Sequence, residues 1–273
     1  MKKKILKIAA LIIAVALIIG IGVVANALNG NPISKMLARK AADAYLEEHY
    51  PNTDYYIETL GFSFKFTGYY VHIRSDSSID TQFSLEIDMV GNVLRDSYED
   101  VQNGFVTARR VEQAYRELCD QIFDASTFIY SSDIEYGTLE IYPREAIDNP
   151  NATDVPDYAL VQEDLVLDQI YDPRDLGTQA GHLIVYVDCE TISVDTAAQI
   201  LLDIRTKFDH ANVPFRAIDF VLQMPRPEEG PRPDESVRIE DYRYEDIYEE
   251  GLADRIALAH AELEDYYAEL DGK

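Results

Sequence analysis

The feature that most constrains the fold of this chain is one apolar run close to its N-terminus. Residues Ile8 to Ala25 are 18 consecutive apolar or glycine residues, and a helix rising about 1.5 Å per residue would make them nearly as long as a bilayer's hydrocarbon core is thick. The run is preceded by four lysines, Lys2, Lys3, Lys4 and Lys7. The length of the run predicts a single-pass transmembrane helix and a cell-membrane localisation, with residues 8–28 in the lipid bilayer. Since positive charge marks the cytoplasmic side, we expect a cytoplasmic N-terminus and an extracytoplasmic location for the residues after about 29.

A cleaved signal peptide is the alternative to this anchor. Ala25-Asn26-Ala27 resembles an A-x-A cleavage site, which would release the chain after Ala27. The apolar run is longer than the usual signal-peptide core of about 7 to 15 residues. We therefore favour a retained signal anchor, and both alternatives stay open.

The composition of the chain excludes several classes of protein. The 273 residues contain 24 Lys and Arg against 50 Asp and Glu, and 47% hydrophobic residues. The hydrophobic content is sufficient for folded cores and excludes disorder. The strong acidic excess excludes a nucleic-acid partner, because binding to phosphate backbones requires basic groups.

Hydrophobic periodicity predicts an α+β fold with two domains after the anchor at 1–30. The first, at 31–130, begins with a helix from Pro32 to Tyr50, which has apolar positions at Ile33, Leu37, Ala41, Ala44 and Tyr45. Alternating residues then predict a four-stranded antiparallel meander at 55–66, 69–74, 83–89 and 93–98. A helix at 107–123 is expected to complete the domain.

The second α+β domain is expected at 131–273. Strands are predicted at 136–142, 182–189, 215–224 and 236–242. The segment Leu160 to Tyr171 is ambiguous between strand and helix, and strand is favoured because Asp172-Pro173 then begins a helix. Ser193 is a predicted N-cap for a helix at 194–211, and a last helix is predicted at 245–270 with an apolar stripe.

Local motifs for catalysis are absent from the sequence. It contains no G-x-x-x-x-G-K-[ST], G-x-G-x-x-G or G-x-S-x-G run. The histidines show no metal-ligand spacing and are interpreted as surface or packed residues: His49, His72, His182, His210 and His260. Cys119 and Cys189 are expected in different domains as free thiols, although export would permit a disulfide. We therefore expect no enzyme, no catalytic residue and no cofactor.

Two acidic clusters leave the question of a metal open. One contains Glu163, Asp164, Asp168, Asp172 and Asp175, and the other contains Glu240, Asp241, Glu245, Asp246, Glu249 and Glu250. Calcium takes several carboxylate oxygens, so either cluster is a candidate site. A solvated acidic face is the favoured interpretation, and any metal ligand stays unknown.

Two further features suggest surfaces for a partner. The sequence has 19 tyrosines and no tryptophan, with the pairs Tyr55-Tyr56, Tyr69-Tyr70 and Tyr266-Tyr267. Outward tyrosines could contact a peptide or glycan, although strand propensity explains most of them. The connector Pro225 to Glu235 contains Pro-Arg-Pro twice and is either a stiff exposed loop or a ligand for a proline-reading partner.

Several segments resemble one family along nearly the whole chain. They are Asn31 to Leu37, Asp54 to Ile57, Ser78 to Thr81, Asp96 to Val101, Val213 to Leu222 and Asp246 to Leu252. These segments are similar to the YfjL-like group of membrane-anchored Firmicutes proteins, whose function is unknown. The resemblance implies a tethered, exported protein and assigns no site residue. The helix-then-meander order of the first domain is also similar to PepSY and cystatin-like modules, which is a likeness of architecture alone.

These observations predict a non-catalytic binding or regulatory module in the cell envelope, with an envelope protein as its partner. Two alternatives stay open: an envelope structural protein that uses divalent cations, and an enzyme whose site is assembled from distant carboxylates.

Overall fold

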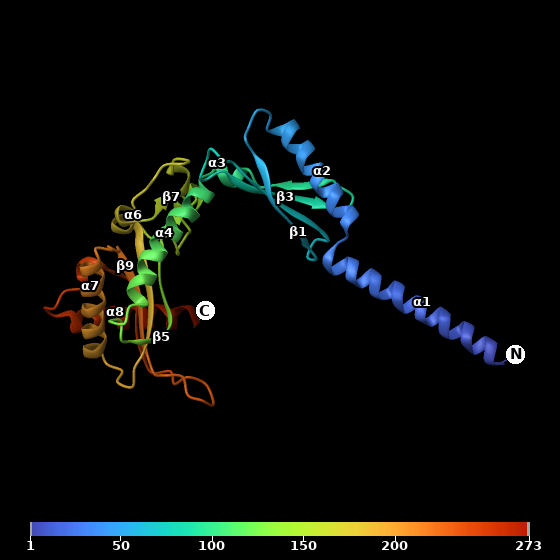
Figure 1. Cartoon of the computed structure of the whole chain (residues 1–273). Helices are drawn as coiled ribbons and strands as arrows, with labels where there is room; N and C mark the ends of the chain where they lie inside the picture. The colour runs from blue at the N-terminus through green and yellow to red at the C-terminus, as the bar shows by residue number, and fades with distance from the viewer. Residues whose placement is uncertain (1, 272–273) are drawn as a thin grey trace. The chain divides into compact units, whose positions relative to one another are not determined.

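The computed structural model describes residues 2–271 and divides the chain into two compact units after Val106 (Figure 1). The division falls within the first residues of a helix, Phe105–Phe123. Each unit has its own sheet and its own buried core. The architecture is therefore α+β, as predicted.

The first unit is a helix followed by an antiparallel meander. Its elements are α1 (Lys2–Asn29), α2 (Pro32–His49), β1 (Tyr56–Ser63), β2 (Gly68–Arg74), β3 (Gln82–Asp88), β4 (Val93–Asp96) and α3 (Glu99–Gln102). The sheet order is β1-β2-β3-β4 and every neighbouring pair is antiparallel. The four-stranded meander predicted from alternating residues is confirmed.

The predicted transmembrane helix falls on α1. Among the residues that the structure describes, no helix combines the length and the apolarity needed to cross a membrane. The side chains at 8–10, 19, 23 and 25 of the apolar run lie outside the described residues.

Helix α2 begins at a capping box. The Asn31 side chain accepts a hydrogen bond from the Ser34 backbone N–H (2.9 Å), and the Ser34 hydroxyl lies 2.7 Å from the Tyr69 hydroxyl of β2. The buried face of α2 is shifted by one residue along the sequence from the face that was predicted. Ala38 and Ala42 are fully buried, whereas Ile33 is 69% exposed, because small side chains let the helix backbone approach the sheet closely.

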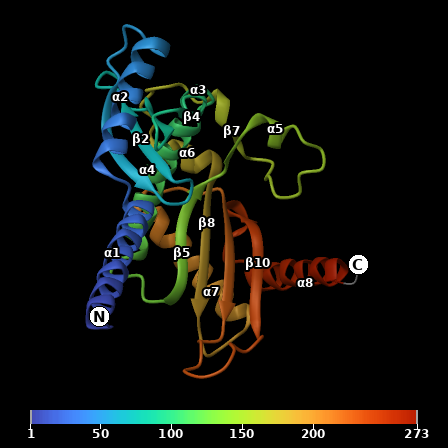
Figure 2. The ribbon, with the colours of Figure 1, turned by 90° about the vertical axis from the view of Figure 1, so that its right-hand side faces the viewer.

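The second unit contains a four-stranded mixed sheet and two further strands. Its elements are α4 (Phe105–Phe123), β5 (Ser131–Leu139), β6 (Ile141–Tyr142), α5 (Arg144–Ile147), β7 (Leu160–Val161), η1 (Gln162–Asp164), α6 (Pro173–Ala180), β8 (Gly181–Asp188), α7 (Val194–Ala211), β9 (Ala217–Gln223), β10 (Ser236–Arg243), η2 (Tyr244–Asp246) and α8 (Leu252–Asp271). The sheet order is β10-β9-β8-β5, with β8 and β9 parallel and the outer pairs antiparallel (Figure 2). Helix α7 is the crossover that parallel pairing requires.

Helix α4 packs in the second unit rather than on the first sheet. Its residues Val111, Tyr115, Cys119 and Ile122 belong to the same buried core as β8, β9 and α7. The structure therefore places the division between Val106 and Thr107, not near residue 130. Consequently, Cys119 and Cys189 lie in one unit, as free thiols, the first buried and the second half-buried.

Three other segments differ from the sequence expectation. The 160–171 region is a strand only at Leu160–Val161, followed by η1 and irregular backbone. The predicted strand at 136–142 is split at Glu140 into β5 and β6. The last helix begins at Leu252, after Gly251 with its φ of 68°, and its second half is exposed, with Leu270 at 48%.

Tyr115 fixes α4 against the second sheet through three glycines. A Cβ on Gly177 would collide with the fully buried Tyr115 ring, a Cβ on Gly181 would collide with the Tyr115 hydroxyl, and a Cβ on Gly137 would meet Cys119 first and the Tyr115 ring at 3.1 Å. The Tyr115 hydroxyl donates a hydrogen bond to the Pro214 carbonyl (2.9 Å). These glycines belong to β5, α6 and β8. β5, α6 and β8 therefore all pack closely around Tyr115.

Gly137→Ala tests this packing. The new methyl group would collide with the Cys119 sulfur, so we expect unfolding of the second unit to become easier by about 1 to 3 kcal/mol. Adding Cys119→Ala should recover part of that loss, which makes the two effects non-additive. Chemical denaturation measures both. Gly61→Ala, where the added methyl would meet no atom within 4 Å, is the control, and additive losses would contradict the proposed contact.

Candidate functional site

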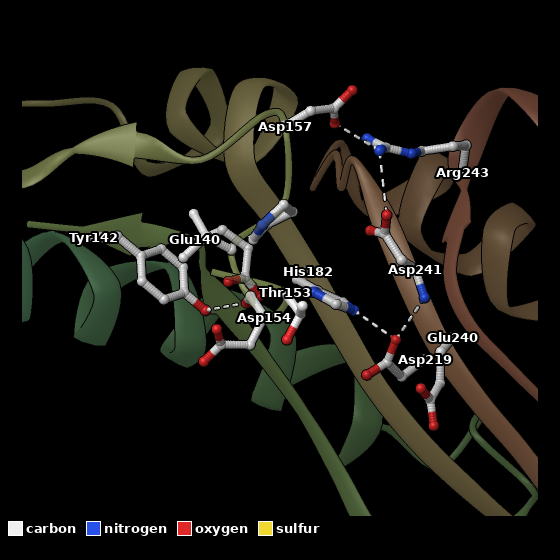
Figure 3. Close-up of a pocket in the computed structure, with 12 residues that line it drawn as sticks. Glu140, Tyr142, Thr153, Asp154, Asp157, His182, Asp219, Glu240, Asp241 and Arg243 are labelled. Carbon is white, nitrogen blue, oxygen red and sulfur yellow. Dashed lines mark hydrogen bonds and ion pairs between the residues drawn. The ribbon is translucent and has the colours of Figure 1, made fainter. Parts of the chain in front are cut away.

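A pocket of about 630 Å³ opens beside the sheet of the second unit (Figure 3). Its lining is rich in carboxylates and comes from segments far apart in the sequence. The lining residues are Glu140, Tyr142, Thr153, Asp154, Val155, Pro156, Asp157, His182, Asp219, Glu240, Asp241 and Arg243.

Strand alternation turns the central residues of the site away from the core. Leu183 and Val185 of β8 are fully buried in the core, so His182 projects from the opposite face. The parallel register pairs Ile184 with Asp219, which places Asp219 of β9 on the same face as His182. Glu140 reaches this face from the break between β5 and β6.

His182 lies between two carboxylates. Its Nδ1 is 2.6 Å from Glu140 Oε1, and its Nε2 is 3.0 Å from Asp219 Oδ1 (Figure 3). The second contact is a close charge contact without aligned hydrogen-bond geometry, because Nε2 has no hydrogen-bond acceptor among the described residues. The residue is only 8% exposed, so the contacts act in a poorly solvated environment.

The two carboxylates keep the imidazole charged. Burial by itself lowers the pKa of His182, but Asp219 and Glu140 outweigh burial and raise the pKa to about 9. The ring is therefore an imidazolium at neutral pH and has no lone pair with which to accept a proton.

A bulge in β10 supplies the third side of the site. The register of β10 against β9 shifts between Ile239 and Tyr242, and Asp241 within this bulge has a φ of 49°. Its backbone N–H donates to Asp219 Oδ1 (2.7 Å), and its carboxylate accepts a hydrogen bond from the Tyr158 hydroxyl (2.7 Å). Because of the bulge, Asp241 makes hydrogen bonds both to β9, through Asp219, and to the loop that contains Tyr158.

The segment that contains Asp157 and Tyr158 covers this part of the pocket. Asp157 pairs with Arg243 (2.7 Å), and the Arg243 guanidinium lies 4.3 Å from the centre of the Tyr158 ring. The Tyr158 ring also meets His182 edge-on, with 6.5 Å between the ring centres. Tyr158 therefore contacts both cationic residues of the site.

The hydroxyl groups at this pocket are poorly placed to act as nucleophiles. Among the described residues that line the pocket, Thr153 has the one aliphatic hydroxyl, and it is exposed. Burial and the Asp241 carboxylate raise the pKa of Tyr158 well above its usual value, so this hydroxyl stays protonated. The lining also brings six carboxylates from distant parts of the sequence into one pocket, which is the feature that an enzyme with a carboxylate-lined site would require.

The two predicted acidic clusters are divided among several places. In the first, Glu163 accepts a hydrogen bond from the Arg144 backbone, Asp164 pairs with the Arg144 side chain and Asp172 caps α6. In the second, Glu240 and Asp241 line the pocket, whereas Glu245 pairs with Arg216. Among the described residues, no group of three His, Cys, Asp or Glu side chains could hold a metal ion.

The sequence reasoning did not distinguish His182 from the other histidines. His49 stacks on Tyr45, and His260 Nδ1 lies 3.1 Å from the Arg238 carbonyl oxygen. The carboxylates around His182 come from positions 140 and 219, so no local motif marks the site. The one available signal was a histidine at the start of a buried strand.

The other candidate surfaces are occupied by intramolecular contacts only in part. Tyr69 is buried, whereas Tyr266 is 50% exposed. In the connector, Arg232 pairs with Asp188 (2.6 Å) and Asp133 (2.8 Å). This pairing holds the second Pro-Arg-Pro against the end of the sheet.

The charge state of His182 predicts a pH dependence of stability. The pKa in the folded state, about 9, lies above the ordinary value of 6.5, so the stabilisation is fully present below about pH 6.5 and is lost as the pH rises through about 9. We expect the free energy of unfolding of the second unit to fall by a few kcal/mol in this interval. Urea unfolding at pH 6 and pH 9.5 measures the fall.

His182→Gln should flatten this dependence, because it removes the titrating ring, whereas His49→Gln in the first unit should leave it unchanged. An unaltered pH dependence in His182→Gln would show that other groups are responsible.

Comparison with known proteins identifies the family to which the chain belongs. No curated protein and no solved structure matches the chain. The family model of the YfjL-like N-terminal domain matches residues 2–97, and that of the YfjL-like C-terminal domain matches residues 115–257. The two matches lie on either side of the structural division at Val106, and the resemblance found in the sequence is confirmed. The chain therefore belongs to the YfjL-like family.

Proposed function

We propose that this protein is a membrane-anchored, non-catalytic binding module of the cell envelope. In this proposal the N-terminal lysines are cytoplasmic, residues 8–28 contact the lipid bilayer and the remainder is extracytoplasmic. The second unit binds an envelope protein through the pocket around His182. The observation that carries the binding role is the imidazolium held between Glu140 and Asp219.

The apolar surface of α1 supports the anchor. Every large apolar side chain of this helix whose exposure is described is open to the surroundings, from Val15 at 47% to Ile18 and Ile21 at 69%. Such a continuous apolar surface is unfavourable in water. Lipid would remove it from water, and the preceding lysines favour a cytoplasmic N-terminus.

The chemistry of the pocket supports binding over catalysis. A general base needs a pKa near the working pH and a free lone pair, whereas His182 is protonated and closely flanked by carboxylates. A nucleophile is activated by a neighbouring base or by a lowered pKa, whereas burial and the Asp241 carboxylate raise the pKa of the Tyr158 hydroxyl well above its usual value. Fixed charges of this kind are suited to recognising a ligand.

Membrane fractionation tests the anchor. We expect the full-length chain to remain with the membrane after alkaline carbonate washing. Replacing Ile13 and Leu17 together by arginine should release the chain, because each arginine in the middle of a spanning helix costs on the order of 3 kcal/mol. Ile33→Arg, at an exposed position outside the run, is the control. Release of the unmodified chain would contradict the anchor, and a mature N-terminus at Leu28 would show cleavage after Ala27.

Crosslinking in the native membrane tests the binding role. We expect the full-length protein to capture a reproducible envelope partner and His182→Gln to lose it. Arg226→Ala, an exposed change in the connector, should retain the partner unless the connector makes the contact. Capture that is independent of His182 would remove the pocket from the proposal, and a reaction catalysed by the wild-type chain and lost in the variant would overturn the non-catalytic assignment.

A further inference from the structure

The most exposed apolar side chains that follow α1 in the first unit lie in three short segments. Among the described side chains they are Val90 at 71%, Ile33 at 69%, and Met36 and Phe64 at 64% each. Phe64 lies in the turn between β1 and β2, Val90 lies in the turn between β3 and β4, and the other two lie at the start of α2.

The strand register brings these three segments to one end of the first sheet. Ser63 pairs with Gly68, and Gly68 pairs with Asp88, so the β1–β2 turn and the β3–β4 turn close the same end. The Tyr69 hydroxyl, beside this end, lies 2.7 Å from the Ser34 hydroxyl of α2. The start of α2 is therefore held next to the two turns, and the apolar side chains form one group.

The end of α1 lies at the same place. Asn29 is the last residue of α1, and Gly30 lies between it and α2. A Cβ on Gly30 would collide with the side chains of Tyr69 and Phe62, so the connection is packed against the sheet. Ile33 follows Asn29 by four residues, and four residues of chain span at most about 14 Å. Whatever the direction of α1, the apolar group begins within that distance of its end.

Unpaired basic side chains accompany this apolar group. They are Lys35, Arg39 and Lys40 of α2 and Lys65 of the β1–β2 turn, and all are exposed. None of them pairs with a carboxylate among the described residues, whereas Arg74 of β2 pairs with Glu58. The chain has 50 acidic and 24 basic residues, so cations left without an acidic partner favour an anionic partner outside the chain.

The side chains of α2 are arranged against two ordinary preferences. Its basic residues lie in its first half and its carboxylates, Asp43, Glu47 and Glu48, lie in its second half, whereas the helix dipole favours the reverse order. Its small residues Ala38 and Ala42 face the sheet, and the larger Ile33 and Met36 face away from it. A contact with a surface that is both anionic and apolar accounts for both departures.

We propose that this end of the first unit docks on the anionic phospholipid surface next to the membrane anchor, with Ile33, Met36, Phe64 and Val90 among the headgroups and the neighbouring basic side chains on the phosphates. The inference rests on the proposed anchor and adds a second, peripheral contact to it. A phospholipid surface presents negative charge over an apolar layer, and amphipathic surfaces enter it by about 5 to 10 Å. Docking would hold the first unit against the membrane instead of leaving it free on its tether.

Single-tryptophan variants of the full-length chain test this inference, because the sequence contains no tryptophan. Met36→Trp and Phe64→Trp place the fluorophore in the proposed contact. Ile79→Trp is the control, at a position that is 48% exposed in the β2–β3 turn at the opposite end of the sheet. In vesicles of phosphatidylglycerol with acyl chains brominated near the headgroups, we expect both contact variants to lose most of their fluorescence, since bromine quenches only at short range. Ile79→Trp should lose little.

The role of the basic residues is tested in the same vesicles. Lys35→Glu and Arg39→Glu together, added to Met36→Trp, should restore most of the lost fluorescence because the new carboxylates are repelled by the headgroups. Brominated phosphatidylcholine, which carries no net charge, should quench Met36→Trp less than phosphatidylglycerol does.

The outcomes separate this inference from the anchor. Equal quenching at the two ends of the sheet, or equal quenching in the two lipids, would overturn the inference. A shift of the emission to shorter wavelength without quenching by bromine would show that protein covers this surface, and would also overturn it. If the chain resisted carbonate washing in these cases, the anchor would stand and only the docking would fall. A chain that carbonate removed from the vesicles would overturn the anchor and the docking together.

Discussion

The second unit depends on the contact between Tyr115 and three glycines. Glycine at 177 and 181 leaves room for the ring and hydroxyl of Tyr115, glycine at 137 leaves room for Cys119 and the edge of the same ring, and the hydroxyl donates a hydrogen bond to the Pro214 carbonyl. Close packing of this kind fixes the backbone as well as the side chain. Gly181 immediately precedes His182, so the same contact that attaches α4 also determines where β8 begins and where its first polar side chain stands.

The pocket shows how a charge can be kept at the edge of a core. Moving an imidazolium out of water is costly, and two carboxylates are needed to keep it ionised. Such an arrangement is a poor way to gain stability, since a packed apolar residue would serve as well. In the proposed binding role, the imidazolium on a face lined by Asp154 and Glu240 would serve recognition, for which the position of each charge matters more than the net energy.

Much of the fold could be predicted from local signals, and the site could not. The N-cap Ser193 and the apolar positions Ala197, Ile200, Leu201, Ile204 and Phe208 of α7 are all as expected, because capping and a 3.6-residue period are local properties. The assignment of α4 failed because its apolar stripe shows that it packs, without showing on which sheet. No local motif marked His182, because its partners are brought to it by the fold from 42 and 37 positions away in the sequence.

The left-handed backbone at Asp241 narrows the substitutions that the site tolerates. A φ of 49° favours glycine, asparagine and aspartate over other residues, whereas the hydrogen bond from Tyr158 and the contact with Arg243 require an acceptor side chain. Asparagine alone satisfies the backbone and keeps the shape of the acceptor, but it removes the charge. Natural variation among YfjL-like chains at this position is therefore expected to fall between aspartate and asparagine, and it would report how strongly each chain depends on a negatively charged pocket.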